Sequence, residues 1–348
     1  MKTLRRLPTL SLSLALLAAS TGITSAALAT RTYSSGAQSV AINGVTCSEV
    51  TGWSGGDIAG TVTTSSLGGT TKKHISSISY DPIVVETTLP LSPALTDALS
   101  SFLSGKNTPQ PLTLTTADAN GKTESTLLAA NAVIEEVQFP KLDGSSKDPF
   151  RLTFIFRAES VKSVAADGSA TRAGAKVGAG AIASNFRITL DGLPSTRIAS
   201  LEAFSITNTT TGKPAGVFNA ASAAIATPNI SDLTVAISAA DRAAWTAWRD
   251  TFLVQGNSQD TAEKSATLEL LGPDMKSTIF TLKLANLGLI RLSTPPTEGE
   301  AIARLQAELY VETASLPSAT APAAPPKAVL DAPASLNIAP VKRPVVKP

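Results

Sequence analysis

One short stretch has the spacing of a hydrolase nucleophile. Residues 52–56 (GWSGG) match the Gly-x-Ser-x-Gly turn that exposes a serine between a strand and a helix. Such a serine needs a histidine and a carboxylate to activate it. Residues 57–66 (DIAGTVTTSS) favour a strand or loop over a helix, and the single histidine, His74, lies in the same segment. We therefore interpret the glycines as turn or bulge residues and expect no catalytic serine.

Two further patterns resemble a binding or catalytic site. Residues 178–183 (GAGAIA) fit a loose dinucleotide-binding fingerprint, but no buried strand precedes them and no acidic residue stands where a ribose would need one. Glu135 and Glu136 could serve as acid and base, yet adjacent residues of a strand point to opposite faces. We interpret the first as chance in a low-complexity stretch and the glutamates as an exposed charged edge.

Aromatic residues and the histidine complete the candidates. Trp245, Trp248 and Phe252 could stack on a ligand, but their helical spacing favours core packing. His74 stands beside two lysines and is interpreted as a solvated loop residue, because an isolated histidine cannot hold zinc.

The counts of reactive residue types exclude most enzyme chemistry. The chain has 348 residues, with one histidine, one cysteine (Cys47), two methionines and three tryptophans. It therefore has no histidine cluster, no cysteine framework and no zinc site built from several histidines. We expect a protein that is not an enzyme and that has no catalytic, cofactor-binding or metal-binding residues and no cofactor.

The N-terminus has the pattern of a secretory signal peptide. Lys2, Arg5 and Arg6 precede an apolar run at 10–19, and residues 27–29 (ALA) offer a small-residue cleavage site. The alternative is an uncleaved membrane anchor, but this run is too short to cross a bilayer comfortably. We expect residues 1–29 to be removed and the product to be exported, periplasmic or extracellular, with no membrane span in the mature chain.

Charge argues against a nucleic-acid partner. The chain has 29 basic and 27 acidic residues, a formal charge of +2. Removing the three cations of the leader leaves 26 basic against 27 acidic residues. Nucleic-acid binding needs an excess of cations, so we expect no such partner.

Composition divides the mature chain into four parts. Residues 165–184 are nearly all small and predict a flexible linker. Residues 317–348 are rich in proline and alanine and cannot bury enough surface to offset their ordering entropy, so we expect a disordered tail. The blocks between, 30–164 and 185–316, are the expected β domains.

The two blocks repeat one pattern. Each opens with alternating apolar residues that run into a turn dipeptide, Asn43-Gly44 in the first and Asp191-Gly192 in the second. Each then has one helix. Ser92 is the expected cap of the first, and Ser238, with Asp241 three residues on, is the expected cap of the second.

Three strands follow each helix in similar register. Residues 112–121 parallel 268–277, and the final strands, RLTFIFRAE at 151–159 and RLQAELYVE at 304–312, share Arg, Leu and Glu at a constant offset. Between them, Leu127, Ala130 and Asn131 parallel Leu282, Ala285 and Asn286. Matched order and spacing predict a tandem duplication.

The second block carries a family resemblance. NFRITLDGL at 185–193, the Trp-bearing helix at 238–252 and the strand with Leu284-Ala285-Asn286 resemble the phage tail-tube family, which shares its fold with the tube protein of type VI secretion systems and with tail hubs. The resemblance covers about 185–316 well and 38–163 more loosely. The first copy departs from it, with no tryptophan in its helix and Asn43 in place of Asp191.

This resemblance implies a mainly β fold with one helix per domain, as two tandem tail-tube-like β-barrel or sandwich domains. In that family six such domains make a ring with a central channel, and rings stack into a tube. Because this chain has two copies, the implied partner is itself: a homotrimer that makes a pseudo-hexameric ring. Export departs from the family, whose tubes assemble in the cytoplasm, and implies an envelope or extracellular assembly.

Two long segments between the first strand and the helix remain open in interpretation. Residues 54–74 and 205–227 are rich in small polar residues and nearly uncharged. They are either surface loops or, by the resemblance, long hairpins that contribute to the lumen wall or to ring–ring contacts. The alternative for the whole protein is a secreted monomeric β-rich adhesin or ligand-binding module, tethered by its C-terminal tail.

Overall fold

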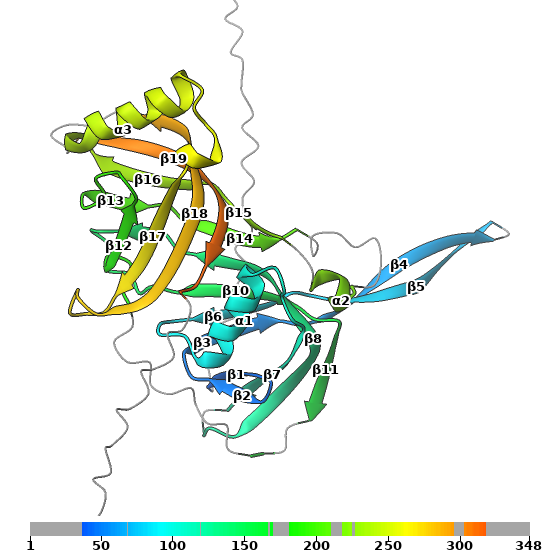
Figure 1. Cartoon of the computed structure of the whole chain (residues 1–348). Coiled ribbons are helices and arrows are strands. Elements are labelled where there is room, and N and C mark those ends of the chain that lie inside the picture. Colours follow the sequence, from blue (N-terminus) through cyan, green and yellow to red (C-terminus); the bar gives the residue numbers. More distant parts are fainter. Residues whose placement is uncertain are drawn as a thin grey trace, which may run out of the picture.

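A computed structural model describes residues 37–317, except 68, 119, 166–167, 170–180, 210–217, 225–226 and 296–302. The predicted signal peptide, most of the predicted linker and nearly all of the predicted tail lie outside the described residues. The described chain is mainly β, as the sequence predicts, with helices at few points (Figure 1).

The first half forms one strongly curved sheet and a helix. Its elements are β1 (Gln38–Ile42), β2 (Val45–Cys47), β3 (Val50–Gly55), β4 (Ile58–Leu67), β5 (Thr70–Tyr80), β6 (Ile83–Thr87), α1 (Pro93–Leu103), β7 (Gln110–Ala117), β8 (Thr123–Phe139), β9 (Leu142–Asp143), β10 (Leu152–Arg157) and β11 (Ser160–Ala165). The strand order is β2-β1-β7-β8-β10-β6-β3, and all neighbours are antiparallel.

A side chain nearly closes this sheet into a barrel. Gln38 on β1 accepts a hydrogen bond from the backbone N–H of Trp53 on β3 at 3.1 Å and donates one to the Trp53 carbonyl at 3.2 Å. The Trp53 indole N–H donates to the carbonyl of Thr115 on β7 at 3.3 Å. β1 and β3, from opposite ends of the strand order, are thus tied together without a strand ladder.

The second half repeats the arrangement. It contains β12 (Phe186–Leu190), β13 (Ile198–Leu201), β14 (Phe204–Asn208), α2 (Ala220–Ala223), β15 (Pro228–Ile230), β16 (Leu233–Ser238), α3 (Arg242–Arg249), β17 (Lys264–Leu271), β18 (Thr278–Ser293) and β19 (Arg304–Ser315). Its main sheet runs β12-β17-β18-β19-β16-β13. This is the order β1-β7-β8-β10-β6-β3 of the first half, strand for strand.

The likeness extends to irregular details. Asn131 on β8 and Asn286 on β18 both have positive φ, 49° and 56°, and each donates its side-chain amide to a glutamate. The ladder of β3 with β6 slips between Val50 and Gly52, and the ladder of β13 with β16 slips between Ile198 and Ser200. The bulges thus fall at matching positions of the two halves.

The caps of the two helices differ from each other. Ser92 caps α1 as predicted, and its hydroxyl accepts from the N–H of Leu95 at 3.5 Å. Ser238 caps a 3-10 turn, Ala239–Asp241, through the N–H of Ala240 at 3.3 Å. Asp241 does not take part in the expected cap: the Ser238 N–H donates to the carbonyl of Arg197 at 3.2 Å. The helical segment then continues through α3 and ends in a π-helical turn, Asp250–Val254.

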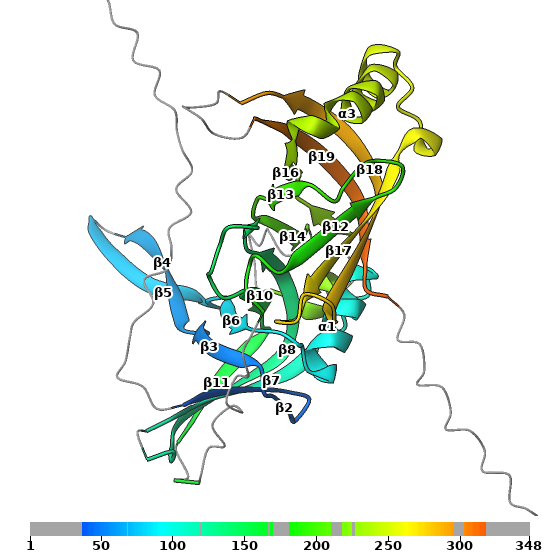
Figure 2. The same cartoon turned by 90° about the vertical axis from the view of Figure 1, so that its left-hand side faces the viewer.

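The two halves exchange strands at their junction. β14 of the second half pairs with β8 of the first, and β9 of the first half pairs with β13 of the second. One buried apolar cluster runs through both halves as a consequence. In both views the hairpin β4–β5 and the helix α3 lie on opposite sides of the molecule (Figures 1 and 2).

Candidate assembly surfaces

The sequence candidates for catalysis do not form a site. Ser54 is exposed on β3, followed by the β4–β5 hairpin rather than a helix, and Gly55 and Gly56 have positive φ of 88° and 78°. Gly55 must be glycine, since a methyl group there would lie 2.0 Å from the Pro82 carbonyl oxygen. His74 is exposed as predicted, but it lies on strand β5 rather than in a loop. Residues 178–180 of the dinucleotide-like pattern lie outside the described residues.

The glutamate pair differs from the prediction. Glu136 lies in the ladder with β10, whereas Glu135 is the extra residue of a bulge in β8. Glu135 is not on an exposed edge: its side chain is 21% exposed and lies 3.7 Å from the Arg157 guanidinium. Burial raises the pKa of Glu135, and Arg157 opposes that rise. The bulge explains the correction, because it turns Glu135 out of the regular alternation.

The aromatic residues of the second helix pack in the core, as predicted. Trp245 is fully buried, Phe252 is 2% exposed and Trp248 is 8% exposed. Trp245 meets Trp248 edge-on with ring centroids 5.9 Å apart, and the Lys264 ammonium lies 5.3 Å from the Trp248 ring. The three rings belong to the buried apolar cluster and attach the helical segment to β18 of the second sheet.

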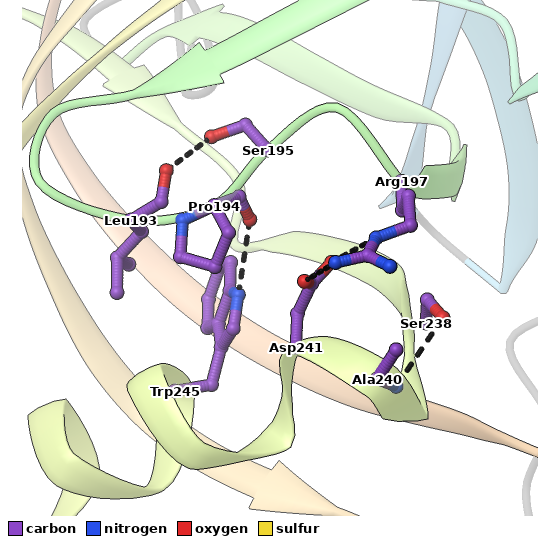
Figure 3. Close-up of polar contacts among 8 residues, drawn as sticks. All are labelled: Leu193, Pro194, Ser195, Arg197, Ser238, Ala240, Asp241 and Trp245. Carbon is purple, nitrogen blue, oxygen red and sulfur yellow. Dashed lines mark hydrogen bonds and ion pairs between the residues drawn. The ribbon is translucent and has the colours of Figure 1, made fainter.

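Polar contacts fix the start of this helix (Figure 3). The Trp245 indole N–H donates to the Pro194 carbonyl at 3.4 Å, in the loop that follows β12. Asp241, with a side chain 3% exposed, binds the guanidinium of Arg197 through both oxygens, at 2.6 and 3.3 Å. Ser195 donates to the Leu193 carbonyl at 2.9 Å and accepts from a backbone N–H of β12. These contacts hold α3 against its own sheet.

The junction of the halves is an antiparallel strand pairing with a buried apolar face. Phe204 faces Phe139, and Ile206 faces Val137. The two phenylalanine rings stack with centroids 4.5 Å apart and planes 4° apart. Ile206 and Val137 are both fully buried. Sequence analysis did not single out these four residues, because no local pattern shows which distant strand will be the partner.

Further contacts extend this junction. Helix α1 of the first half packs against β19 of the second. Lys141 and Glu202 form an ion pair across the halves at 2.8 Å, half-exposed at both ends. The first half thus contributes α1 and an edge of β8, and the second contributes β14 and β19. The contact uses different surfaces on its two sides, which makes it head-to-tail.

The β4–β5 hairpin is a ribbon that projects away from both sheets (Figure 2). Most of residues 54–74 therefore form a hairpin rather than an irregular surface loop. The expected contribution of this hairpin to a lumen wall or to ring–ring contacts stays a prediction. Its two faces differ sharply. One face carries Ile58, Val62, Ile75 and Ile78, which are 52–61% exposed. An isolated two-stranded ribbon is marginally stable in water, and an exposed apolar face of this kind marks a candidate interaction surface.

No helix among the described residues has the length and apolarity to cross a bilayer. No group of three or more histidine, cysteine, aspartate or glutamate side chains in the described ranges could hold a metal ion.

Comparison with known proteins gives partial structural likenesses. No protein-family model and no curated protein sequence matches the chain. Among solved structures, the sheath-tube complex of the extracellular contractile injection system PVC is 19% identical, with a TM-score of 0.34, over 37% of this chain and 88% of that one. The tube-terminating cap of the anti-feeding prophage is 16% identical, with a TM-score of 0.34, over 37% and 88%. Hcp1 from Flavobacterium johnsoniae is 17% identical, with a TM-score of 0.28, over 38% and 97%. Each similarity extends over little more than a third of this chain.

Proposed function

We propose that this chain is an exported, non-enzymatic structural subunit built from a tandem pair of tail-tube-like domains. Three chains would close into a pseudo-hexameric ring outside the inner membrane. The support comes from the sequence pattern of the leader, the resemblance of the second block to the tail-tube family, and the identical strand order of the two halves. No nucleic acid, cofactor or metal takes part in this role.

The observation that carries the proposal is the head-to-tail junction inside the chain. Two halves of the same topology meet through unlike surfaces, α1 and β8 on one side and β14 and β19 on the other. A head-to-tail contact leaves one surface of each kind unused at the two ends of the pair. Repeating it between chains closes a ring if the rotation permits, and the resemblance sets six domains as the expected number.

Light scattering on residues 30–348, over a range of concentrations, tests this proposal. We expect a mass near three chains that persists on dilution. A mass of one chain at every accessible concentration would contradict ring formation and would favour the alternative, a secreted monomeric adhesin or ligand-binding module. A mass of two chains would also contradict it, because a ring closed by two head-to-tail chains would hold four domains rather than six.

A further inference from the structure

The internal junction can be mapped onto two strand edges that have no partner strand among the described residues. The counterpart of β8 is β18, and the bulge at Glu135 in β8 corresponds to Ile290 in β18, since both ladders slip at that point. Val137, which pairs with β14, therefore corresponds to Leu292. Among the described residues, β17 pairs with β18 as far as Leu287, so Gly288–Ser293 have a free edge on that side.

The partner strand maps in the same way. β3 and β13 carry a bulge at matching positions, so Trp53 in the first half corresponds to Leu201 in the second. Five residues further along each chain, Ile58 of β4 therefore corresponds to Ile206 of β14. The second strand of each hairpin agrees. Ile206 pairs with Ile230, and Ile58 pairs with Tyr80, at matching distances from the strands β16 and β6 that follow.

The two hairpins occupy the same place in their halves but are buried differently. Ile206 is fully buried and Ile230 is 7% exposed, because β14 lies against β8. Ile58 is 61% exposed, because β4 pairs only with β5. Likewise Val137 is fully buried, whereas its counterpart Leu292 is only half-buried. In the equivalent pair, Ile58 is thus exposed and Leu292 is partly exposed.

The helix end shows the same contrast. Gly105 and Gly256 both have positive φ and follow the two helical segments, so Val254 corresponds to Leu103 by its distance from the glycine. Leu103, the last residue of α1, is buried, and α1 packs against β19 of the other half. Val254 is 74% exposed, and Ile290 of the neighbouring β18 is 40% exposed. Apolar side chains are thus exposed on both unused surfaces.

We propose that β4 of one chain adds to the free edge of β18 in a second copy of the chain, with Ile58 opposite Leu292. The internal register of β14 on β8 transfers directly: Asp57 lies opposite Ser293, and Ala59 lies opposite Arg291. Main-chain hydrogen bonds along the added strand supply the affinity, and the apolar pair fixes the register. This inference rests on the proposed ring and names its contact between chains.

Charge favours this pairing. In the proposed register Asp57 and Arg291 lie diagonally on one face, within reach of each other. Arg291 already forms an ion pair with Glu308 at 2.8 Å, but 69% of its side chain is exposed. Its guanidinium can therefore also donate hydrogen bonds to a second carboxylate. An exposed edge strand also invites uncontrolled pairing unless a partner covers it, and this contact covers both edges at once.

Disulfide trapping tests the register. The native thiol of Cys47 is buried, and burial raises its pKa to about 11, so Cys47→Ala gives a clean background. In that background Ile58→Cys with Leu292→Cys is oxidised by oxidised glutathione, which is itself reduced as the new bond forms. We expect the double variant to form a covalent species of three chains on non-reducing gels. The matched control is Val62→Cys with Leu292→Cys. Residue 62 lies on the same face of the ribbon as residue 58, but in the proposed register it does not lie opposite residue 292.

The outcomes separate this contact from the ring itself. Particles with the mass of three chains, but no more disulfide in the Ile58 variant than in the Val62 variant, would overturn the proposed register and leave the ring intact. Dimers joined through Ile58→Cys alone would overturn it as well, since they require hairpin-to-hairpin contact. A monomer before oxidation would contradict the ring.

A charge substitution gives an independent measurement. Ile58→Asp leaves the monomer folded, because Ile58 is exposed there, but it places a carboxylate in the proposed apolar contact. We expect assembly to require at least about tenfold more protein, as for the loss of a buried interface anchor. Thr63→Asp, on the polar face of the same ribbon, is the control and should assemble as wild type. Equal assembly of the two variants would overturn the proposal.

Discussion

Replacing Trp245 with alanine should lower the free energy of unfolding by about 3–5 kcal/mol, as for other fully buried tryptophans. The indole is fully buried, meets Trp248 edge-on and donates its N–H to the Pro194 carbonyl. Its loss leaves a cavity between the helix and the second sheet and frees the loop after β12. The urea midpoint at fixed protein concentration measures the effect.

Trp245→Phe is the matched control. It keeps an aromatic ring in the core and removes the hydrogen bond to Pro194. We expect it to lose less than half as much stability as Trp245→Ala. If Trp245→Ala unfolds at the wild-type midpoint, the helix is not attached through this ring, and the description of the second half in Figure 3 is wrong.

Replacing Gly288 with alanine should also destabilise the second half. A methyl group at Gly288 would lie 2.0 Å from Cζ of Tyr310, which faces it across the β18–β19 ladder. The Tyr310 ring cannot move aside freely, because its hydroxyl donates to Glu263 at 2.5 Å. Burial and this bond raise the pKa of Tyr310 to about 12. Overpacking of this kind costs about 1–3 kcal/mol, again measured by the urea midpoint.

Two comparisons give the cause of the Gly288 effect. In a Tyr310→Ala background the ring is gone, and Gly288→Ala should then be nearly neutral, which is a strong coupling between the two sites. Gly144→Ala is the control in wild type, since its new methyl group would lie 3.6 Å from the nearest atom. An equal loss for Gly288→Ala with and without Tyr310 would refute the proposed clash.

Local features of the fold could be predicted from sequence because their causes are local. The Asn43-Gly44 turn has φ values of 51° and 77°, the left-handed geometry that this dipeptide favours. Ser92 and Pro93 mark the start of α1 for similar reasons. The matching register of the last strands in each half also follows from their alternating burial.

Other features depend on contacts between distant residues and could not be predicted. Asp241 was expected to complete a local cap, but it binds Arg197, which reaches it from the loop before β13. Glu135 was expected on an exposed edge, but a bulge turns it toward Arg157. The stacking of Phe139 on Phe204 joins strands from different halves, and a sequence pattern does not specify which strands pair. The candidate assembly surface also depends on contacts between distant residues, so the sequence alone could not predict it.

The comparison of the halves supplies what the sequence pattern alone could not. Equivalent residues differ in burial: Ile206 is fully buried and Ile58 is exposed, and Leu103 is buried and Val254 is exposed. Each difference falls on a surface that the internal junction uses in one half and leaves open in the other. We therefore assign the exposed apolar residues to the proposed contacts between chains.

Electron microscopy of purified residues 30–348 tests the central claim most directly. We expect ring-shaped particles with three-fold symmetry and six similar lobes around a channel, because each chain contributes two domains of one topology. Particles with a single pair of lobes would contradict the account, and so would rings in which the lobe count is not twice the number of chains.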